Sequence, residues 1–268
     1  MANKVTIITG ASAGIGAGFA RRLGADGHRL VLAARRRAEL ETVAADAERA
    51  GSPRALVVPT DVTIRRDVDA LSERAVAEFG GYDVWINNAG QGINRSVLDL
   101  TGDDVDDMMA INVKSALYGM QAAARYFIER GSGHIINVSS FLGRLPLALH
   151  RSAYNAAKAA LNALTANLRG EMRARAPGVR VTLVMPGMVA TEFGMNVVNA
   201  PPDAAIYAGP HVQTVQQVAD IVANVIEHPV AEVYTNASSA EMARTYFADV
   251  EAFETQAGNP WAPRTARS

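Results

Sequence analysis

Cysteine is absent from this chain of 268 residues, and its five histidines are scattered singly. The first absence excludes disulfide bonds, a cysteine nucleophile and thiolate metal sites, and it fits a reducing cytosol. Single histidines without ligand spacing do not indicate a metal site either. We therefore expect no metal and a cytoplasmic location.

A charge excess and long apolar runs are missing as well. Lysine and arginine number 26 against 27 aspartates and glutamates, so the formal net charge is −1. This balance, without long runs of like charge, lacks the electrostatic footprint of a protein that binds nucleic acid or anionic membranes. No apolar run approaches the length of about 18 residues that a membrane span needs, and the first strand-like run begins at Lys4. We expect no nucleic-acid partner, no membrane partner and no signal peptide.

The chain alternates between strand-like and helix-like stretches. Strands are expected at 5–9, 29–34, 55–60, 83–86, 134–138, 179–185 and 231–234, helices at 17–23, 38–50, 103–129, 152–175 and 215–227, and one amphipathic segment at 241–255. Such alternation indicates right-handed βαβ units and a parallel sheet. The length suits one α/β domain over 1–268, in which the proline-interrupted segment 188–212 forms a substrate lid and 236–268 a C-terminal extension that ends in an extended tail, 259–268.

The first strand-like run ends in a glycine-rich turn, Gly10-Ala11-Ser12-Ala13-Gly14-Ile15-Gly16, and a helix-like stretch follows it. Glycines there let backbone N–H groups approach a pyrophosphate at a helix N-terminus, where the helix dipole favours anions. The spacing is G-x-x-x-G-x-G instead of G-x-G-x-x-G, and a plain tight turn explains a lone glycine pattern equally well.

The second strand ends at Ala34 and Arg35 follows it. A sheet that binds NAD would place a carboxylate here, on the ribose 2′-hydroxyl, whereas a guanidinium can pair with a 2′-phosphate. Arg35 therefore favours NADP(H), with NAD(H) as the alternative cofactor and a solvated arginine as the alternative role.

Tyr154 and Lys158 stand four residues apart in an alanine-rich stretch, so a helix would place them on one face. An ammonium beside a phenol favours the phenolate and lowers the phenol pKa from about 10, as a general acid/base needs. The alternative is a surface pair. Asn112, in the middle of an expected helix, is either functional or a solvent-facing or back-bonded amide.

Four motifs follow one another along the chain: T-G-A-S-A-G-I-G at 9–16, N-N-A-G at 87–90, S-S at 139–140 and Y-N-A-A-K at 154–158. In this order and spacing the chain resembles the single-domain branch of the short-chain dehydrogenase/reductase (SDR) family over roughly residues 4–235. The resemblance implies an α/β fold, a Rossmann-type doubly wound parallel sheet of about seven strands with helices on both faces. It also implies a homo-oligomer, tetramer or dimer, built on the helices at 103–129 and 151–175.

The resemblance implies catalytic roles for four residues. Tyr154 would give a proton to the substrate oxygen on reduction and take it on oxidation. Lys158 would lower the Tyr154 pKa and hold the nicotinamide ribose, while Ser140 would hydrogen-bond the substrate oxygen. Asn112 would interrupt its helix to hold a water that links Lys158 to solvent.

The cofactor-binding residues that the resemblance implies come from several separate segments. They are Gly10, Ser12, Gly14, Ile15 and Gly16 at the phosphates and ribose, Arg35 at the 2′-phosphate, Asp61 and Val62 at the adenine, Asn88, Ala89 and Gly90 along the middle, Tyr154 and Lys158 at the nicotinamide ribose, and Val189 and Thr191 at the carboxamide. Many relatives that use NADP carry a basic residue where this chain has Ala13, so Arg35, helped by Arg36, must recognise the 2′-phosphate.

Of the two adjacent serines, Ser140 is favoured as catalytic because two residues and then Gly143 follow it, as is typical of the family. Ser139 is then structural. Ser140 and Tyr154 are fourteen positions apart, one more than the resemblance implies, and we place the extra residue in the loop 144–152. The shape of the substrate mouth is therefore less predictable than the chemistry.

The substrate pocket is expected from residues 91–97, 141–151 and 188–212. These segments contain seven large apolar residues that predict an apolar substrate, although core packing or a subunit contact explains them as well: Leu142, Leu145, Leu147, Leu149, Phe193, Met195 and Tyr207. Arg95 and Arg144 would either meet an acidic group or be surface charges.

We expect an NADP-dependent oxidoreductase that interconverts a small-molecule carbonyl and an alcohol by hydride transfer. One alternative is a dinucleotide-binding sensor or regulator that has the fold without the reaction. A second alternative is an epimerase or dehydratase of the larger SDR branch, which shares Tyr-x-x-x-Lys.

Overall fold

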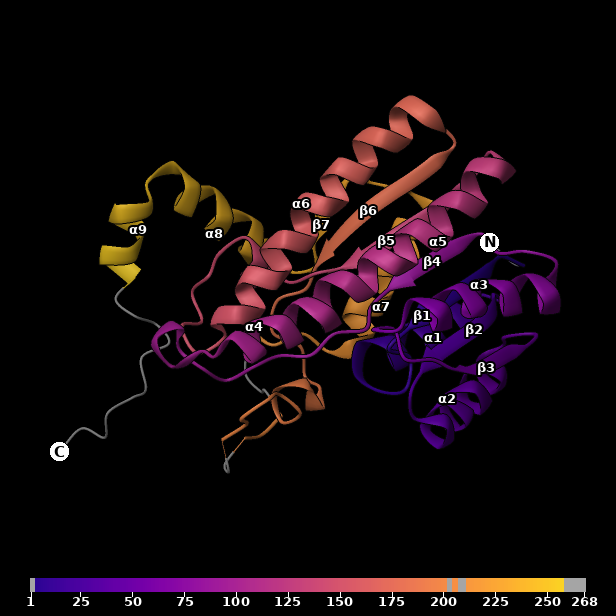
Figure 1. Ribbon diagram of the computed structural model, residues 1–268, viewed down its shortest axis with the longest axis horizontal. Coiled ribbons are helices and arrows are strands. Elements are labelled where there is room, and N and C mark those ends of the chain that lie inside the picture. The colour runs from indigo at the N-terminus through magenta and orange to yellow at the C-terminus, as the bar shows by residue number, and fades with distance from the viewer. Residues whose placement is uncertain (1–2, 202–203, 207–210, 258–268) are drawn as a thin grey trace.

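The computed structural model describes residues 3–201, 204–206 and 211–257, so Tyr207 and the tail 259–268 lie outside the described residues. A parallel sheet of seven strands forms its centre (Figure 1). The strands are β1 (Val5–Thr9), β2 (Arg29–Ala34), β3 (Ala55–Pro59), β4 (Val84–Asn87), β5 (Gly133–Val138), β6 (Val179–Met185) and β7 (Glu232–Tyr234). Their spatial order, β3-β2-β1-β4-β5-β6-β7, reverses direction between β1 and β4, and ligands bind at such a point. The predicted Rossmann-type fold is confirmed.

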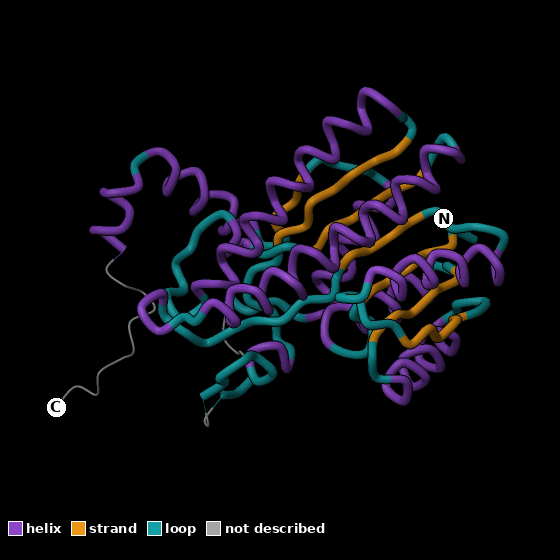
Figure 2. Tube along the Cα trace, in the orientation of Figure 1, coloured by secondary structure: helices purple, strands orange, loops and turns teal. Residues whose placement is uncertain are grey.

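Helices cover both faces of the sheet, with the strands between them (Figure 2). They are α1 (Gly14–Ala25), α2 (Arg37–Ala50), α3 (Arg65–Phe79), α4 (Gly102–Met109), α5 (Ser115–Arg130), α6 (Ser152–Arg175), α7 (Val215–Glu227), α8 (Ala237–Ala248) and α9 (Val250–Ala257). Short 3₁₀ turns lie at Val97–Asp99, Phe141–Gly143 and Glu192–Gly194. Helices α1, α2 and α7 contribute to the core on one face, and α3, α5 and α6 to the core on the other.

The core follows from the alternation of side chains along buried strands. On β1, Ile8 packs with α1, α2 and α7, whereas its neighbour Ile7 packs with the helices of the opposite face. All five residues of β1 are buried, because a parallel sheet covered on both faces exposes neither side of its central strands.

Two expected stretches differ from the structure, and one helix was not expected. The stretch 103–129 is not one helix, because a π-helical turn, Ala110–Lys114, separates α4 from α5. The stretch 241–255 is two helices, since Asp249 between them has an extended backbone (φ −157°, ψ 98°). Helix α3 was not expected at all, because only Val68, Leu71 and Ala75 of its fifteen residues are buried, which leaves a weak apolar pattern.

The strand and helix ends are otherwise within three residues of the expected positions. Helix α1 begins at Gly14, inside the glycine-rich turn, which brings its N-terminus closer to the strand ends than expected. The described helices include none that is long and apolar enough to cross a membrane.

Candidate active site

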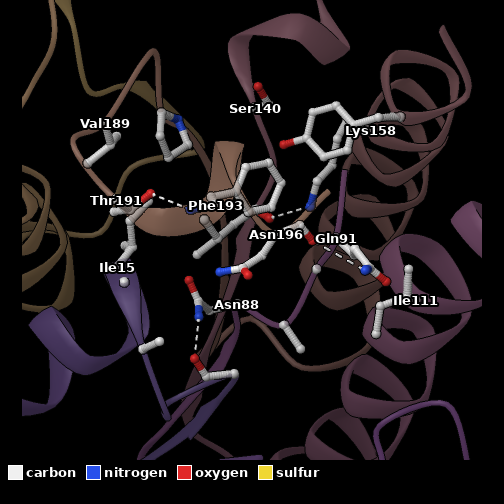
Figure 3. Close-up of a pocket in the computed structure, with 18 of the residues that line it drawn as sticks. Ile15, Asn88, Gln91, Ile111, Ser140, Lys158, Val189, Thr191, Phe193 and Asn196 are labelled. Atoms are coloured by element: carbon white, nitrogen blue, oxygen red, sulfur yellow. Dashed lines mark hydrogen bonds between the residues drawn. The ribbon is translucent and has the colours of Figure 1, made fainter. Parts of the chain in front are cut away.

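A cavity of about 570 Å³ opens at the carboxyl ends of the strands. Ser140 and Lys158 lie on one side of it and Ile15 and Asn88 on the other (Figure 3). Of the site residues predicted from the sequence, those that line this cavity are Gly10, Ser12, Gly14, Ile15, Arg35, Asp61, Val62, Asn88, Ala89, Gly90, Ser140, Tyr154, Lys158, Val189 and Thr191. Gly16 and Asn112 are the two that lie behind its wall. The structure thus brings together residues from six strand ends.

The turn between β1 and α1 requires glycine at two positions. Gly10 has φ +66°, and a Cβ there would lie 2.8 Å from Ala89 Cα. A Cβ on Gly16 would lie 2.3 Å from the Gly10 carbonyl oxygen. Ala13, the N-cap of α1, provides no side-chain hydrogen bond to the first turn. The open N–H groups of this helix end therefore fit a pyrophosphate.

Asn88, directly after β4, is hydrogen-bonded to the same turn. Its backbone N–H donates to Thr9 Oγ1 (3.0 Å), and its side-chain Nδ2 donates to the carbonyl oxygens of Thr9 (3.0 Å) and Gly10 (3.3 Å). The N-N-A-G motif therefore fixes the spacing between the glycine turn and the middle of the cavity.

Charged residues gather where β2 and β3 end. Arg36 donates to Ser12 Oγ (3.1 Å) and pairs with Glu39 (3.4 Å). The Thr63 hydroxyl, which donates to Asp61 (2.6 Å), holds the pKa of Asp61 below its ordinary value, and the charge of Arg35 acts in the same direction. Arg35 is exposed and lines the cavity, so its guanidinium can reach a phosphate there.

Tyr154 and Lys158 are buried in the wall of the cavity, 7% and 3% exposed, so a surface pair is excluded. The Lys158 Nζ donates to the Val138 carbonyl (3.1 Å) and lies 5.7 Å from the centre of the Tyr154 ring. Burial lowers the pKa of Lys158 to about 8. The phenol ring also lies close to Phe193, at 5.7 Å between ring centres.

Ser140, two residues after the end of β5, has an extended backbone, and its Oγ accepts a hydrogen bond from the Leu142 N–H (3.1 Å). This bond leaves the hydroxyl proton available for donation into the cavity. The Ser139 hydroxyl, in contrast, donates to Asn162 Oδ1 (2.6 Å) and to the Lys158 carbonyl (3.3 Å).

Asn112 is 1% exposed, so a solvent-facing amide is excluded. Its Nδ2 donates to the carbonyls of Gln91 (2.9 Å) and Met108 (3.1 Å), and its Oδ1 accepts from the Gln91 N–H (3.3 Å). The bond to Met108, four residues earlier, competes with the helical ladder and coincides with the π-helical turn. A Cβ on Gly90 would lie 2.8 Å from Asn112 Oδ1 and 3.4 Å from Lys158 Nζ, so the two side chains flank that glycine.

The expected apolar lining is partly wrong. Leu142 and Phe193 line the cavity, but Leu145 packs with Phe141 and with Ala243 of α8, and Leu149 is 57% exposed. Leu147 packs against the same cluster, and Met195 is 42% exposed. The positions of Leu145 and Leu147 involve contacts with the C-terminal helices, which the loop sequence does not reveal.

Arg95 and Arg144 also lie outside the cavity lining. Arg95 pairs with Asp104 (3.3 Å), and Arg144 pairs with Glu232 at the start of β7. The three expected pocket segments, 91–97, 141–151 and 188–212, do contribute further lining residues: Gln91, Phe141, Ala148, His150, Arg151, Met188, Glu192 and Asn196. Ile111 also lines the cavity and lies outside those segments, and its place beside Asn112 is the signal that could have found it.

Comparisons with known proteins agree with this architecture. An uncharacterised oxidoreductase of Staphylococcus aureus strain MW2 is 38% identical over 191 residues, which cover 71% of this chain and 80% of that protein. The structure of a short-chain dehydrogenase/reductase from Burkholderia phymatum in complex with NAD is similar, with a TM-score of 0.83 and 26% identity over 94% of this chain and 95% of that one. A short chain dehydrogenase from Burkholderia cenocepacia J2315 in complex with NADP gives a TM-score of 0.78 and 28% identity over 95% and 97%.

The family model described as short chain dehydrogenase matches residues 4–202, which is most of the chain. Both the motifs and the parallel sheet that carries them lie largely within that range. The chain belongs to the short-chain dehydrogenase/reductase family and is an oxidoreductase of that family.

Proposed function

We propose that this oxidoreductase interconverts a carbonyl compound and an alcohol with a nicotinamide dinucleotide, NADP(H) in preference to NAD(H). The observation that carries the proposal is the arrangement of Tyr154, Lys158 and Ser140 around one side of a cavity whose other side is a glycine turn at a helix N-terminus. When bound, the nicotinamide donates or accepts the hydride.

The residues present fit such a cofactor. The turn from Gly10 to Gly16 places the uncapped N-terminus of α1 at the cavity, where its N–H groups fit a pyrophosphate. Asp61 and Val62 adjoin the adenine end, and Val189 and Thr191 adjoin the nicotinamide end of the same cavity. Solved relatives hold NAD or NADP, which supports a dinucleotide here.

Tyr154 moves the proton in this proposal. It gives its phenolic proton to the substrate oxygen on reduction and takes it back from the hydroxyl on oxidation. The Lys158 ammonium, 5.7 Å from the ring, favours the ionised phenol and also holds the ribose of the nicotinamide. Asn112, across Gly90 from Lys158, holds the water that links the lysine to solvent.

Ser140 orients the substrate oxygen and stabilises the charge that develops on it. Its Oγ already accepts from the Leu142 N–H, which polarises the hydroxyl and leaves its proton to donate. Two donors, from Ser140 and Tyr154, then converge on one substrate oxygen.

The substrate is proposed to be largely apolar. Its side of the cavity presents Ile111, Phe141, Leu142 and Phe193. The segment that follows β6 lies across this side, because Val198 donates to the Gly92 carbonyl (3.0 Å) and accepts from the Asn94 N–H (2.8 Å). We propose that this segment, within 188–212, is the substrate lid.

We also propose a homo-oligomer, dimer or tetramer, built on α4, α5 and α6. Ala156 and Ala159 are exposed on α6, whereas Ala157 is buried in the core, so the outer face of this helix permits close approach of a second copy. Light scattering of the purified protein tests this, and the mass of a single chain would contradict it.

The decisive experiment is a panel of aldehydes and ketones with NADPH, followed by absorbance, with NADH run in parallel. We expect oxidation of NADPH with apolar carbonyls. Cofactor binding without turnover of any carbonyl would favour the sensor, and conversion of substrate without net NADPH oxidation would favour the epimerase or dehydratase.

A further inference from the structure

Asn162 lies on α6 one turn beyond Lys158 and two turns beyond Tyr154, on the same face of the helix. Its side chain is 7% exposed and stands apart from the four motifs. A buried amide is costly unless its polar atoms are bonded, so its partners indicate why the position is polar.

The amide of Asn162 is bonded on both sides of Ser140. Its Oδ1 accepts from the Ser139 hydroxyl (2.6 Å), and its Nδ2 donates to the Gly143 carbonyl (3.0 Å). The Asn162 side chain therefore joins the end of β5 and the end of the following 3₁₀ turn to one point on α6. Ser140 lies between these two attachments.

The turn that contains Ser140 lies directly on the helix. A Cβ at Gly143 would be 2.8 Å from the carbonyl carbon of Lys158 and 2.9 Å from Asn162 Nδ2. Inside the turn, the Gly143 N–H donates to the Ser140 carbonyl (3.0 Å) and the Leu142 N–H donates to Ser140 Oγ (3.1 Å). The direction of the Ser140 hydroxyl thus depends on the turn, and the turn is held by Asn162.

We propose that Asn162 is a positioning residue that holds Ser140 at its working distance from Tyr154. The inference rests on the proposed function, in which both hydroxyls bind the substrate oxygen. One continuous helix carries Tyr154 and Asn162, so the serine is fixed relative to the tyrosine without a flexible connection. Misplacement of a catalytic group by about 1 Å can cost about 100-fold in rate.

The variant Asn162→Leu removes both hydrogen bonds and keeps the branching and the number of heavy atoms of the side chain. We expect kcat to fall by about 10- to 100-fold, while the Kd for the cofactor stays unchanged. In a Ser140→Ala background, the same substitution should cost less than about threefold, because no hydroxyl remains to be positioned. Equal losses of kcat in the two backgrounds would overturn the proposal.

Thr165→Val is the matched control for loss of a buried polar group on α6. Thr165 is fully buried, accepts from Asn137 Nδ2 (2.9 Å) and donates to the Leu161 carbonyl (2.7 Å), away from the turn that holds Ser140. Thr165→Val should destabilise the protein about as much as Asn162→Leu does. It should nevertheless change kcat by less than about twofold at a temperature where every variant is folded. If Asn162→Leu does not fold, Ser139→Ala removes one attachment and should lower kcat by about 3- to 10-fold in the same comparison.

A second measurement is independent of turnover. Hydrogen exchange of the backbone amides in 141–145, read by mass spectrometry, should be about tenfold faster in Asn162→Leu than in the wild type and in Thr165→Val. Unchanged exchange would overturn the proposal. A wild-type protein that turns over no carbonyl would instead refute the proposed function, and the exchange data would still decide whether Asn162 holds the turn.

Discussion

In the proposed function, the choice between NADP(H) and NAD(H) depends on Arg35. It stands at the rim of the cavity, directly after β2, where its charge also acts on Asp61. Arg36 beside it is already bonded to Ser12 and Glu39. The two adjacent arginines therefore differ in the structure, since the Arg36 guanidinium already has partners within the chain.

Arg35→Ala should raise the Kd for NADPH by about tenfold or more and change the Kd for NADH by less than about twofold, because only NADPH carries a 2′-phosphate. Fluorescence titration with each cofactor measures both constants. Arg37→Ala is the control, since Arg37 is exposed on α2 and pairs with Glu41 (3.6 Å). Equal weakening of NADH and NADPH by Arg35→Ala would refute its role.

His134 makes stability depend on pH. Its ring is buried in β5 with Nε2 2.9 Å from Thr182 Oγ1, and burial, aided by Arg180 and Lys4, lowers its pKa to about 4. The folded protein therefore keeps the ring neutral, while the unfolded chain protonates it near pH 6.5. Stability is fully present above that pH and is lost as the pH falls toward 4, by about 2 kcal/mol at pH 5.

Urea unfolding of the wild type and of His134→Gln at pH 7, 6 and 5 measures this contribution. The variant should lose less stability between pH 7 and pH 5, and His28, whose pKa burial also lowers, should account for part of the remaining loss. His228→Gln, a change at an exposed histidine, should keep the wild-type dependence. A His134→Gln profile parallel to that of the wild type would contradict the argument.

At the scale of elements, the sequence motifs were sufficient to place strands and to identify the glycine turn, since three of the four motifs mark the carboxyl end of a strand. They were insufficient for the π-helical turn, which coincides with bonds from Asn112 to the Met108 carbonyl and to the remote Gln91 loop. The apolar period of α4 and α5 alone predicts one continuous helix. The break at Asp249 has no comparable signal in the sequence.

The glycine turn between β1 and α1 should be needed for cofactor binding. Gly16→Ala should weaken binding of NADPH by about tenfold or more, because its Cβ would lie 2.3 Å from the Gly10 carbonyl oxygen and 2.6 Å from Asn88 Nδ2. Gly170→Ala is the control on α6, where an added Cβ meets nothing within 4 Å. It should keep cofactor affinity and stabilise the protein by about 0.5–1 kcal/mol. Unchanged affinity in Gly16→Ala would show that the turn does not hold the cofactor.

At the scale of the whole molecule, the reversal of strand order between β1 and β4 gathers segments that are far apart in the chain. Gly10, Asn88, Ser140 and Tyr154 come from four such segments and surround one cavity. That these four residues meet at one cavity was predictable, because they belong to the four motifs on which the family resemblance, and with it the expected sheet, rests. The substrate side was less predictable, because Leu145 packs against Ala243 of α8, a helix that follows the last motif in the sequence. The described parts of α8 and α9 lie at one side of the layers of sheet and helices (Figure 1).

In the proposed mechanism, Tyr154 gives and takes the proton of the reaction. Tyr154→Phe removes only the hydroxyl, so the Kd for NADPH should stay within about threefold while kcat falls by at least about 1000-fold. Tyr118→Phe is the control, since Tyr118 on α5 contacts Arg65 away from the cavity and should keep wild-type kcat. Loss of turnover in Tyr154→Phe with cofactor binding retained is the predicted result, and a kcat equal to that of the wild type would contradict the mechanism.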